Sequence, residues 1–220
     1  MDGLYIGQGR FVTIDGPDLS GKSTFSHTIA EALRVFGVRV LWTTEPWYEV
    51  PSGEAIRKYL MGDSKYAIDP LLFQELFKVN RAEHLKYVIN PALARGEFVV
   101  CDRYISSSIV YGKADGVSED LLWQLNAQFP VPELVFVLQV SDAEARRRAS
   151  QRGQTERLSK WDQDPEFQER VRKYYWELCR HKADRICRDP RNVVMLNGEE
   201  SREEIQRQAA EHLLGMPAVR

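Results

Sequence analysis

Eight residues near the N-terminus have the types and the spacing that hold the phosphate groups of a nucleotide. They read Gly16-Pro17-Asp18-Leu19-Ser20-Gly21-Lys22-Ser23, and Thr24 follows them. In such a loop the glycines let backbone N–H groups point at a polyphosphate, the lysine reaches the β- and γ-phosphates, and the serine hydroxyl binds Mg²⁺. The spacing also occurs in chance glycine-rich turns. Because a strand-like run precedes it and an amphipathic run follows it, we expect residues 16–24 to bind ATP, with Ser23 as a ligand of Mg²⁺.

A second pair of polar residues follows an apolar run. Asp102 and Arg103 come directly after the strand-like residues 97–101. A carboxylate at a strand end can hold Mg²⁺ opposite Ser23, and the neighbouring arginine can bind a phosphate oxygen. The alternative is an ordinary Asp-Arg pair on the surface. We expect both residues to be catalytic, with Asp102 as the second metal ligand.

Three arginines lie in or next to a polar stretch, residues 146–160, that has no apolar stripe of its own. They are Arg148, Arg152 and Arg157. Such arginines could close over a transferring phosphoryl group as a lid and neutralise its charge, or they could form a solvated basic face. Their spacing does not decide between the two.

An aromatic pair and an arginine recur at intervals of four residues in a predicted long helix. Phe73, Phe77 and Arg81 therefore share one side of it. A phenylalanine pair at this spacing is more often part of a core than a platform for a nucleobase. The pattern leaves both roles open.

The composition is that of an ordinary globular protein. The chain has 220 residues, 43% of them hydrophobic, and a net charge of −2, so no overall field attracts nucleic acid and we expect none as a partner. Its three cysteines lack the spacing of a disulfide framework or a zinc site. There is no apolar run near the roughly 18 residues of a membrane span and no signal-peptide core. We expect a cytoplasmic protein that does not associate with membranes.

Strand-like and helix-like segments alternate along the chain. Five short runs rich in β-branched residues predict strands at 11–15, 38–42, 97–101, 134–138 and 193–196, with helical patterns between them. This alternation predicts an α/β fold with a parallel five-stranded sheet, helices on both faces and ligands at the carboxyl ends of the strands. We expect one domain over residues 1–220, with a lid at about 146–160.

Four stretches together resemble thymidylate kinases, the nucleoside monophosphate kinases that make dTDP from dTMP and ATP. They are DGPDLSGKST, LFKVNRAEHL, ALARGEFVVCDRYISSSIVYG and RRRASQRGQTERLS. The resemblance covers nearly the whole chain in the family's order, and NRAEH combined with DRYxxSS is far more specific than the loop alone. The resemblance implies the three-layer sandwich of the P-loop NTPases, phosphorylation of dTMP with ATP and Mg²⁺, and a homodimer.

The resemblance also implies roles for individual residues. Asp18 resembles the carboxylate that meets the 3′-hydroxyl of the acceptor sugar, Phe77 the ring under thymine, and Arg81 a donor to a thymine carbonyl. Arg103 resembles the arginine on the acceptor phosphate. Further acceptor-side contacts are implied for Ser107 and Tyr111. Leu19 stands where some relatives have a basic residue. The resemblance therefore implies that a lid arginine neutralises the negative charge of the transition state.

Two departures from the family pattern keep other activities open. Thr44 stands where many relatives have an arginine on the acceptor phosphate, and Gly112 where many bacterial relatives have glutamine. The segment TTEPW also resembles deoxynucleoside kinases, in which the glutamate, here Glu45, would act as general base on a sugar hydroxyl. In a monophosphate kinase Glu45 would be a magnesium or structural group. A switch or regulator that binds nucleotide without transferring phosphate is a third possibility, although the guanine-reading N-K-x-D is absent from the sequence.

Overall fold

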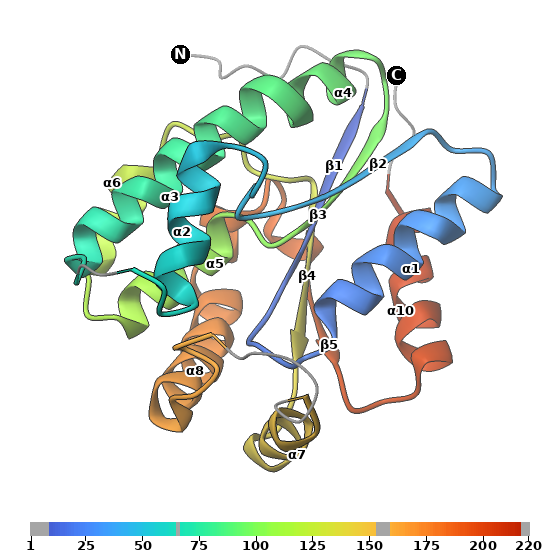
Figure 1. The fold of residues 1–220 in the computed structure, drawn as a ribbon. Helices are drawn as coiled ribbons and strands as arrows, with labels where there is room; N and C mark the ends of the chain where they lie inside the picture. The colour runs from blue at the N-terminus through green and yellow to red at the C-terminus, as the bar shows by residue number, and fades with distance from the viewer. Residues whose placement is uncertain (1–8, 65–66, 153–158, 217–220) are drawn as a thin grey trace.

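A computed structural model describes residues 9–64, 67–152 and 159–216 (Figure 1). Five strands form one parallel sheet in the order β2-β3-β1-β4-β5. The strands are β1 (Arg10–Asp15), β2 (Val40–Thr44), β3 (Phe98–Asp102), β4 (Leu134–Gln139) and β5 (Val193–Asn197). The predicted parallel five-stranded α/β fold is confirmed, although β2 begins two residues later than expected.

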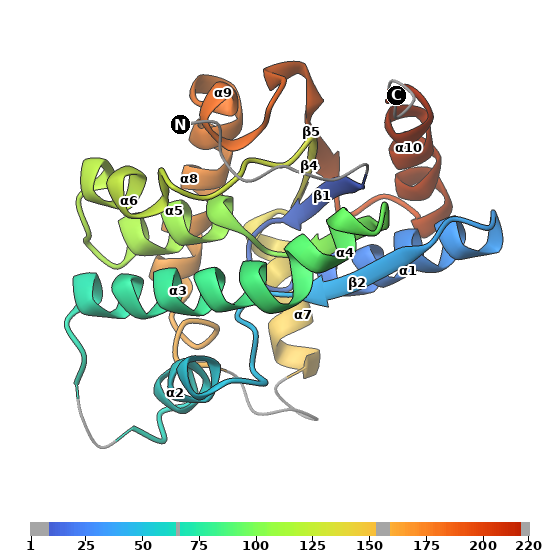
Figure 2. The ribbon, with the colours of Figure 1, turned by 90° about the horizontal axis from the view of Figure 1, so that it is seen from above.

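Helices cover both faces of this sheet, as Figures 1 and 2 show. The helices described are α1 (Lys22–Val35), α2 (Pro51–Leu60), α3 (Pro70–His84), η1 (Leu85–Ile89), α4 (Asn90–Ala94), α5 (Ile105–Ala114), α6 (Glu119–Asn126), α7 (Asp142–Arg152), α8 (Pro165–His181), α9 (Ala183–Ile186), η2 (Pro190–Asn192) and α10 (Arg202–Leu214). In the described ranges, no helix has both the length and the apolar character needed to cross a membrane.

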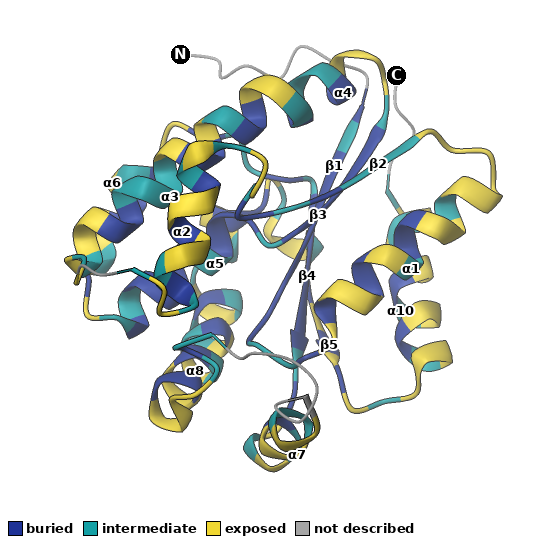
Figure 3. Ribbon diagram, viewed as in Figure 1, coloured by how far each residue is buried: buried dark blue, intermediate teal, exposed yellow. Residues whose placement is uncertain are grey.

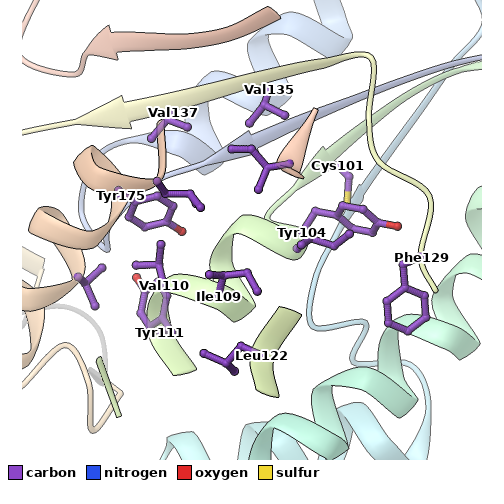
Figure 4. Close-up of a cluster of buried hydrophobic side chains, with 14 of the residues drawn as sticks. Cys101, Tyr104, Ile109, Val110, Tyr111, Leu122, Phe129, Val135, Val137 and Tyr175 are labelled. Atoms are coloured by element: carbon purple, nitrogen blue, oxygen red, sulfur yellow. The ribbon is translucent and has the colours of Figure 1, made fainter. Parts of the chain in front are cut away.

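Two hydrophobic cores follow from the alternation of side chains along the strands. Val12 and Ile14 of β1 face α1 and α10, whereas Phe11 faces the opposite core with α3, α5 and α8. In Figure 4, Val135 and Val137 of β4 lie in this second core with residues of α5. Buried residues accordingly fill the central strands β1, β3 and β4 and the inner sides of the helices, whereas the edge strands β2 and β5 are partly exposed (Figure 3). Burial of both faces explains why the sequences of the central strands β3 and β4 are almost continuously apolar.

The predicted long helix is divided into three parts. Asp69 caps its start by accepting hydrogen bonds from the N–H groups of Leu71, at 2.9 Å, and Leu72, at 3.2 Å. A π-helical turn, η1, separates α3 from α4, which has Pro91 as its second residue. Proline has no N–H to donate to the preceding turn, so the regular α-helical bonding cannot pass through this position. No helix was predicted from the sequence over the residues of α5.

Candidate active site

The phosphate-binding loop joins the end of β1 to the start of α1, as the motif predicts. Gly16 has φ 145° and Gly21 φ 93°, conformations that side-chain-bearing residues rarely adopt. A Cβ atom at Gly16 would also collide with the carbonyl oxygen of Leu138. Lys22 is buried, and its Nζ donates to the carbonyl oxygen of Pro17 at 3.0 Å. The loop therefore holds its lysine against its own backbone.

A cavity of about 330 Å³ opens on one side of the loop. Its wall combines the loop with the carboxyl ends of β2 and β3 and with side chains from α3 and α5. The predicted site residues on this wall are Asp18, Lys22, Ser23, Glu45, Phe77, Arg81, Asp102, Arg103, Ser107 and Tyr111. The volume lies at the lower end of the roughly 300–1,000 Å³ of small-molecule sites. We call it the acceptor cavity.

Asp18 is the most connected carboxylate of the acceptor cavity. Its Oδ1 accepts from Arg103 and lies 3.5 Å from Nζ of Lys22, and its Oδ2 accepts from the Tyr111 hydroxyl at 2.8 Å and from Nε2 of Gln168 at 3.0 Å. Burial alone would raise the pKa of Asp18, but the charges of Arg103 and Lys22 hold it well below its usual range. Asp18 is therefore ionised, and it holds the side chains of Arg103 and Lys22 close to each other.

Arg103 is held in an unusual backbone conformation. Its φ of 71° lies in the left-handed region, and its N–H donates to the carbonyl oxygen of Ile14 at 2.8 Å. Its guanidinium stacks over the ring of Tyr111, 5.1 Å from the centroid. Strain of this kind persists where surrounding structure imposes it, often at functional sites. Ser107, predicted as an acceptor-side contact, accepts from Nη1 of Arg103 at 3.4 Å and donates to Asp15 at 2.7 Å.

Glu45 and Arg81 form an almost completely buried ion pair. Oε2 of Glu45 accepts from Nε of Arg81 at 2.8 Å, and Nδ1 of His84 lies 3.4 Å from Oε1. Arg81 also donates to Ser108 at 2.9 Å and to Asn126. Burial opposes ionisation of Glu45, but the Arg81 charge keeps its pKa below the ordinary value. A carboxylate so stabilised is a weak base, so the geometry does not favour the deoxynucleoside kinase alternative.

The residues predicted to hold Mg²⁺ share the acceptor cavity. Ser23 and Asp102 both line it, and Oδ1 of Asp102 is buried without a hydrogen-bond partner among the described residues. Hydroxyl and carboxylate oxygens are the ligands that Mg²⁺ prefers, usually few of them because phosphates and water supply the rest. An unpaired carboxylate oxygen opposite the loop serine therefore fits this ion.

A second cavity, of about 520 Å³, lies on the other side of the phosphate-binding loop. Ser20, Gly21 and Thr24 line it together with residues of α7 and α10. We call it the donor cavity. The loop is thus shared by two cavities, each large enough for a small molecule.

Arg148 belongs to the donor cavity. From α7 its guanidinium donates to the carbonyl oxygens of Leu19, at 2.9 Å, and Gly198, at 2.8 Å, and to Glu144 at 2.6 Å. It therefore bridges α7 to the loop instead of lying over the acceptor cavity. Arg157 and the side chain of Arg152 lie outside the described residues, so their predicted lid role remains a prediction.

Several cavity residues had no prediction from the sequence. Those used below are Gln74, Arg57 and Trp161, which line the acceptor cavity, and Gln168, which donates to Asp18 of that cavity. Gln74 precedes Phe77 by three residues, which places both on one side of α3. That spacing is the only sequence signal that could have found it. The other three come from separate segments that only the tertiary structure brings to the cavity.

The comparisons agree with the resemblance carried by the motifs. A family model described as thymidylate kinase matches residues 14–209. The chain is 36% identical over 213 residues to a probable thymidylate kinase of Pyrococcus abyssi, an alignment covering 95% of this chain and 100% of that relative. It is 36% identical over 185 residues to a thymidylate kinase of Deinococcus radiodurans, covering 82% and 88% of the two chains. A thymidylate kinase of Exiguobacterium is 34% identical over 187 residues, covering 82% and 85%.

Proposed function

We propose, from the premise that this chain belongs to the thymidylate kinase family, that dTMP occupies the acceptor cavity and ATP the donor cavity. The protein is an enzyme that phosphorylates dTMP to dTDP with ATP. The single observation that supports this placement is that the two cavities share the phosphate-binding loop, which would bring the γ-phosphate of ATP next to the acceptor phosphate.

The chain's own residues would position and neutralise the two phosphates. Lys22 would leave the Pro17 carbonyl to bind β- and γ-phosphate oxygens, and Arg103 would bind the acceptor phosphate. No general base is required, because a phosphate monoester is largely dianionic near neutral pH, with its second pKa at about 6. Glu45 would then be structural, holding Arg81 in place under the base.

Ser23 and Asp102 would hold Mg²⁺. When bound, this ion neutralises charge on the β- and γ-phosphate oxygens. Arg57 of α2 would supply the acceptor-side cation that Thr44 does not, since it lines the same cavity with its guanidinium over the ring of Tyr48.

A homodimer and a cytoplasmic location complete the proposal. Leu72 and Val79 of α3 and Leu121 of α6 are 61%, 50% and 40% exposed, and an apolar surface on adjacent helices is typical of an interface. Cys101, Cys179 and Cys187 are all free thiols, as expected in a reducing compartment. Light scattering at micromolar concentration tests the dimer.

A product assay tests the proposed reaction. With ATP and Mg²⁺, dTMP and thymidine are offered side by side and the products are separated by chromatography. We expect dTDP to form faster than dTMP forms from thymidine. Faster phosphorylation of thymidine would contradict the proposal and would return Glu45 to the role of general base.

A further inference from the structure

The side-chain amide of Gln74 is buried without a hydrogen-bond partner among the described residues. Gln74 is only 3% exposed, and neither Oε1 nor Nε2 has a partner. Most buried amides in native proteins are satisfied, because an unpaired one loses its bonds to water and gains nothing. Gln74 lines the acceptor cavity. An unpaired donor and an unpaired acceptor are therefore fixed together at the wall of the substrate site.

The Gln74 amide occupies space that is open only because residue 112 of α5 is a glycine. A Cβ atom added to Gly112 would lie 3.0 Å from Cδ of Gln74 and would collide with Cδ2 of Leu122. Leu122 is fully buried, and Figure 4 shows it beside α5. A side chain at position 112 would therefore push the Gln74 amide away from its place. The packing of α5 against α3 and α6 positions the amide.

Two aromatic rings next to Gln74 provide stacking surfaces for a base. Phe77 follows Gln74 by three residues on α3 and lines the same cavity. The ring of Trp161 lies nearly parallel to that of Phe77, at 13°, with centroids 6.4 Å apart. Phe77 and Trp161 both line the acceptor cavity, so each offers a ring on which a base in that cavity can stack.

We propose that Gln74 recognises the imide edge of the acceptor base. Oε1 accepts from N3–H of thymine, and Nε2 donates to the neighbouring carbonyl oxygen. A primary amide offers a donor and an acceptor side by side, which matches a ring N–H next to a carbonyl. This inference rests on the proposed function, since it assumes that dTMP binds in the acceptor cavity.

The replacement Gln74→Met tests the proposal, because methionine keeps the length of glutamine but forms no comparable hydrogen bond. We expect KM for dTMP to rise by roughly 10- to 100-fold, as for the loss of two neutral hydrogen bonds. The base is remote from the reacting phosphate, so kcat should stay within about threefold and KM for ATP should not change. KM for dUMP should rise by the same factor, since uracil has the same imide edge.

Thermal unfolding without substrate separates this role from a structural one. The Gln74 amide makes no hydrogen bond to the described residues, so Gln74→Met should leave the Tm of the substrate-free protein unchanged or raise it. Gln139→Met is the matched control, because Nε2 of Gln139 is also buried and unpaired but Gln139 lines neither cavity, and it should leave both KM values unchanged. A KM for dTMP within about threefold of wild type, or a lower Tm with kcat and KM altered together, would overturn the inference. Failure of the wild-type protein to make dTDP would instead refute the proposed function.

Discussion

Arg81 donates to the Glu45 carboxylate through both Nε, at 2.8 Å, and NH2, at 2.7 Å, and the side chains of both residues are at most 5% exposed. The pair joins the end of β2 to α3, so it connects the sheet to the helix that carries Phe77. Its partners His84, Ser108 and Asn126 complete a buried polar network between α3, α5 and α6. This network fixes the wall against which the acceptor base would lie.

Glu45→Gln should destabilise the fold while leaving the chemistry of transfer intact. Removing one partner of a buried ion pair leaves the other charge uncompensated, which costs about 3–5 kcal/mol. Urea unfolding at neutral pH measures this loss. The pH dependence of kcat at saturating dTMP should be unchanged, because Glu45 would hold Arg81 and would not accept a proton. Loss of activity with full stability would indicate a general base.

Lys22→Ala should lower kcat/KM for transfer by at least about a hundredfold, or roughly 2.7 kcal/mol of transition-state stabilisation. The buried ammonium of Lys22 is the only cation that the residues of the phosphate-binding loop supply. Lys58→Ala is a suitable control, since the Lys58 side chain is 60% exposed and pairs with Glu54 on α2. Steady-state kinetics compares the two variants, and near-normal turnover of Lys22→Ala would mean that the loop has another role.

Arg148→Ala should act mainly on ATP. Its bonds to the carbonyls of Leu19 and Gly198 lie at the donor cavity, so we expect KM for ATP to rise several-fold while KM for dTMP stays within about twofold. The predicted transition-state role then rests on Arg152 or Arg157, whose alanine variants should lower kcat and kcat/KM together. Arg207→Ala on α10 is an exposed control. Wild-type kcat in both Arg152→Ala and Arg157→Ala would refute the lid hypothesis.

Arg57→Ala should weaken acceptor binding. Arg57 lines the acceptor cavity beside Tyr48, 5.4 Å from its ring centroid, and a charged hydrogen bond to phosphate is worth about 1.5–3 kcal/mol. KM for dTMP should therefore rise by roughly 10- to 150-fold with KM for ATP unchanged. Isothermal titration with dTMP provides a second measurement. An unaltered affinity would show that the acceptor phosphate lies elsewhere in the cavity.

The stability of the protein should fall in acid through Asp18 and Glu45. Burial raises the pKa of both carboxyl groups, but nearby positive charges lower it further, so both folded-state pKa values lie below their ordinary ones. The charges are those of Arg103 and Lys22 at Asp18 and of Arg81 at Glu45. A depressed folded pKa contributes stability above the unfolded value, about 4, and that contribution is lost as pH falls through the folded value. Urea unfolding from pH 6 to pH 3 should show the loss beginning below about pH 5. Asp18→Asn should unfold with a shallower pH dependence, and an equally steep one would exclude Asp18 as a source.

The sequence by itself determined the reaction class and the fold. The apolar runs of β1, β3 and β4 indicate strands buried in a sheet covered on both faces, and the spacing of Gly16, Gly21 and Lys22 between a strand and a helix is that of a phosphate-binding loop. Both patterns involve residues that are close together in the chain, so they can be read directly from the sequence. The boundaries were less certain, as the shifted β2 and the π-helical turn before Pro91 show, because pairing and packing decide where an element ends.

The tertiary structure decided which side chains meet. Sequence spacing could not show that Glu45 pairs with Arg81, that Arg148 reaches the loop from the donor side, or that Asp18 gathers Arg103, Tyr111 and Gln168. Nor could it show that Gly112 leaves space for the Gln74 amide. These partners are separated by 36 to 150 positions in the chain. Contacts over such separations depend on strand order and helix packing, which no local pattern encodes.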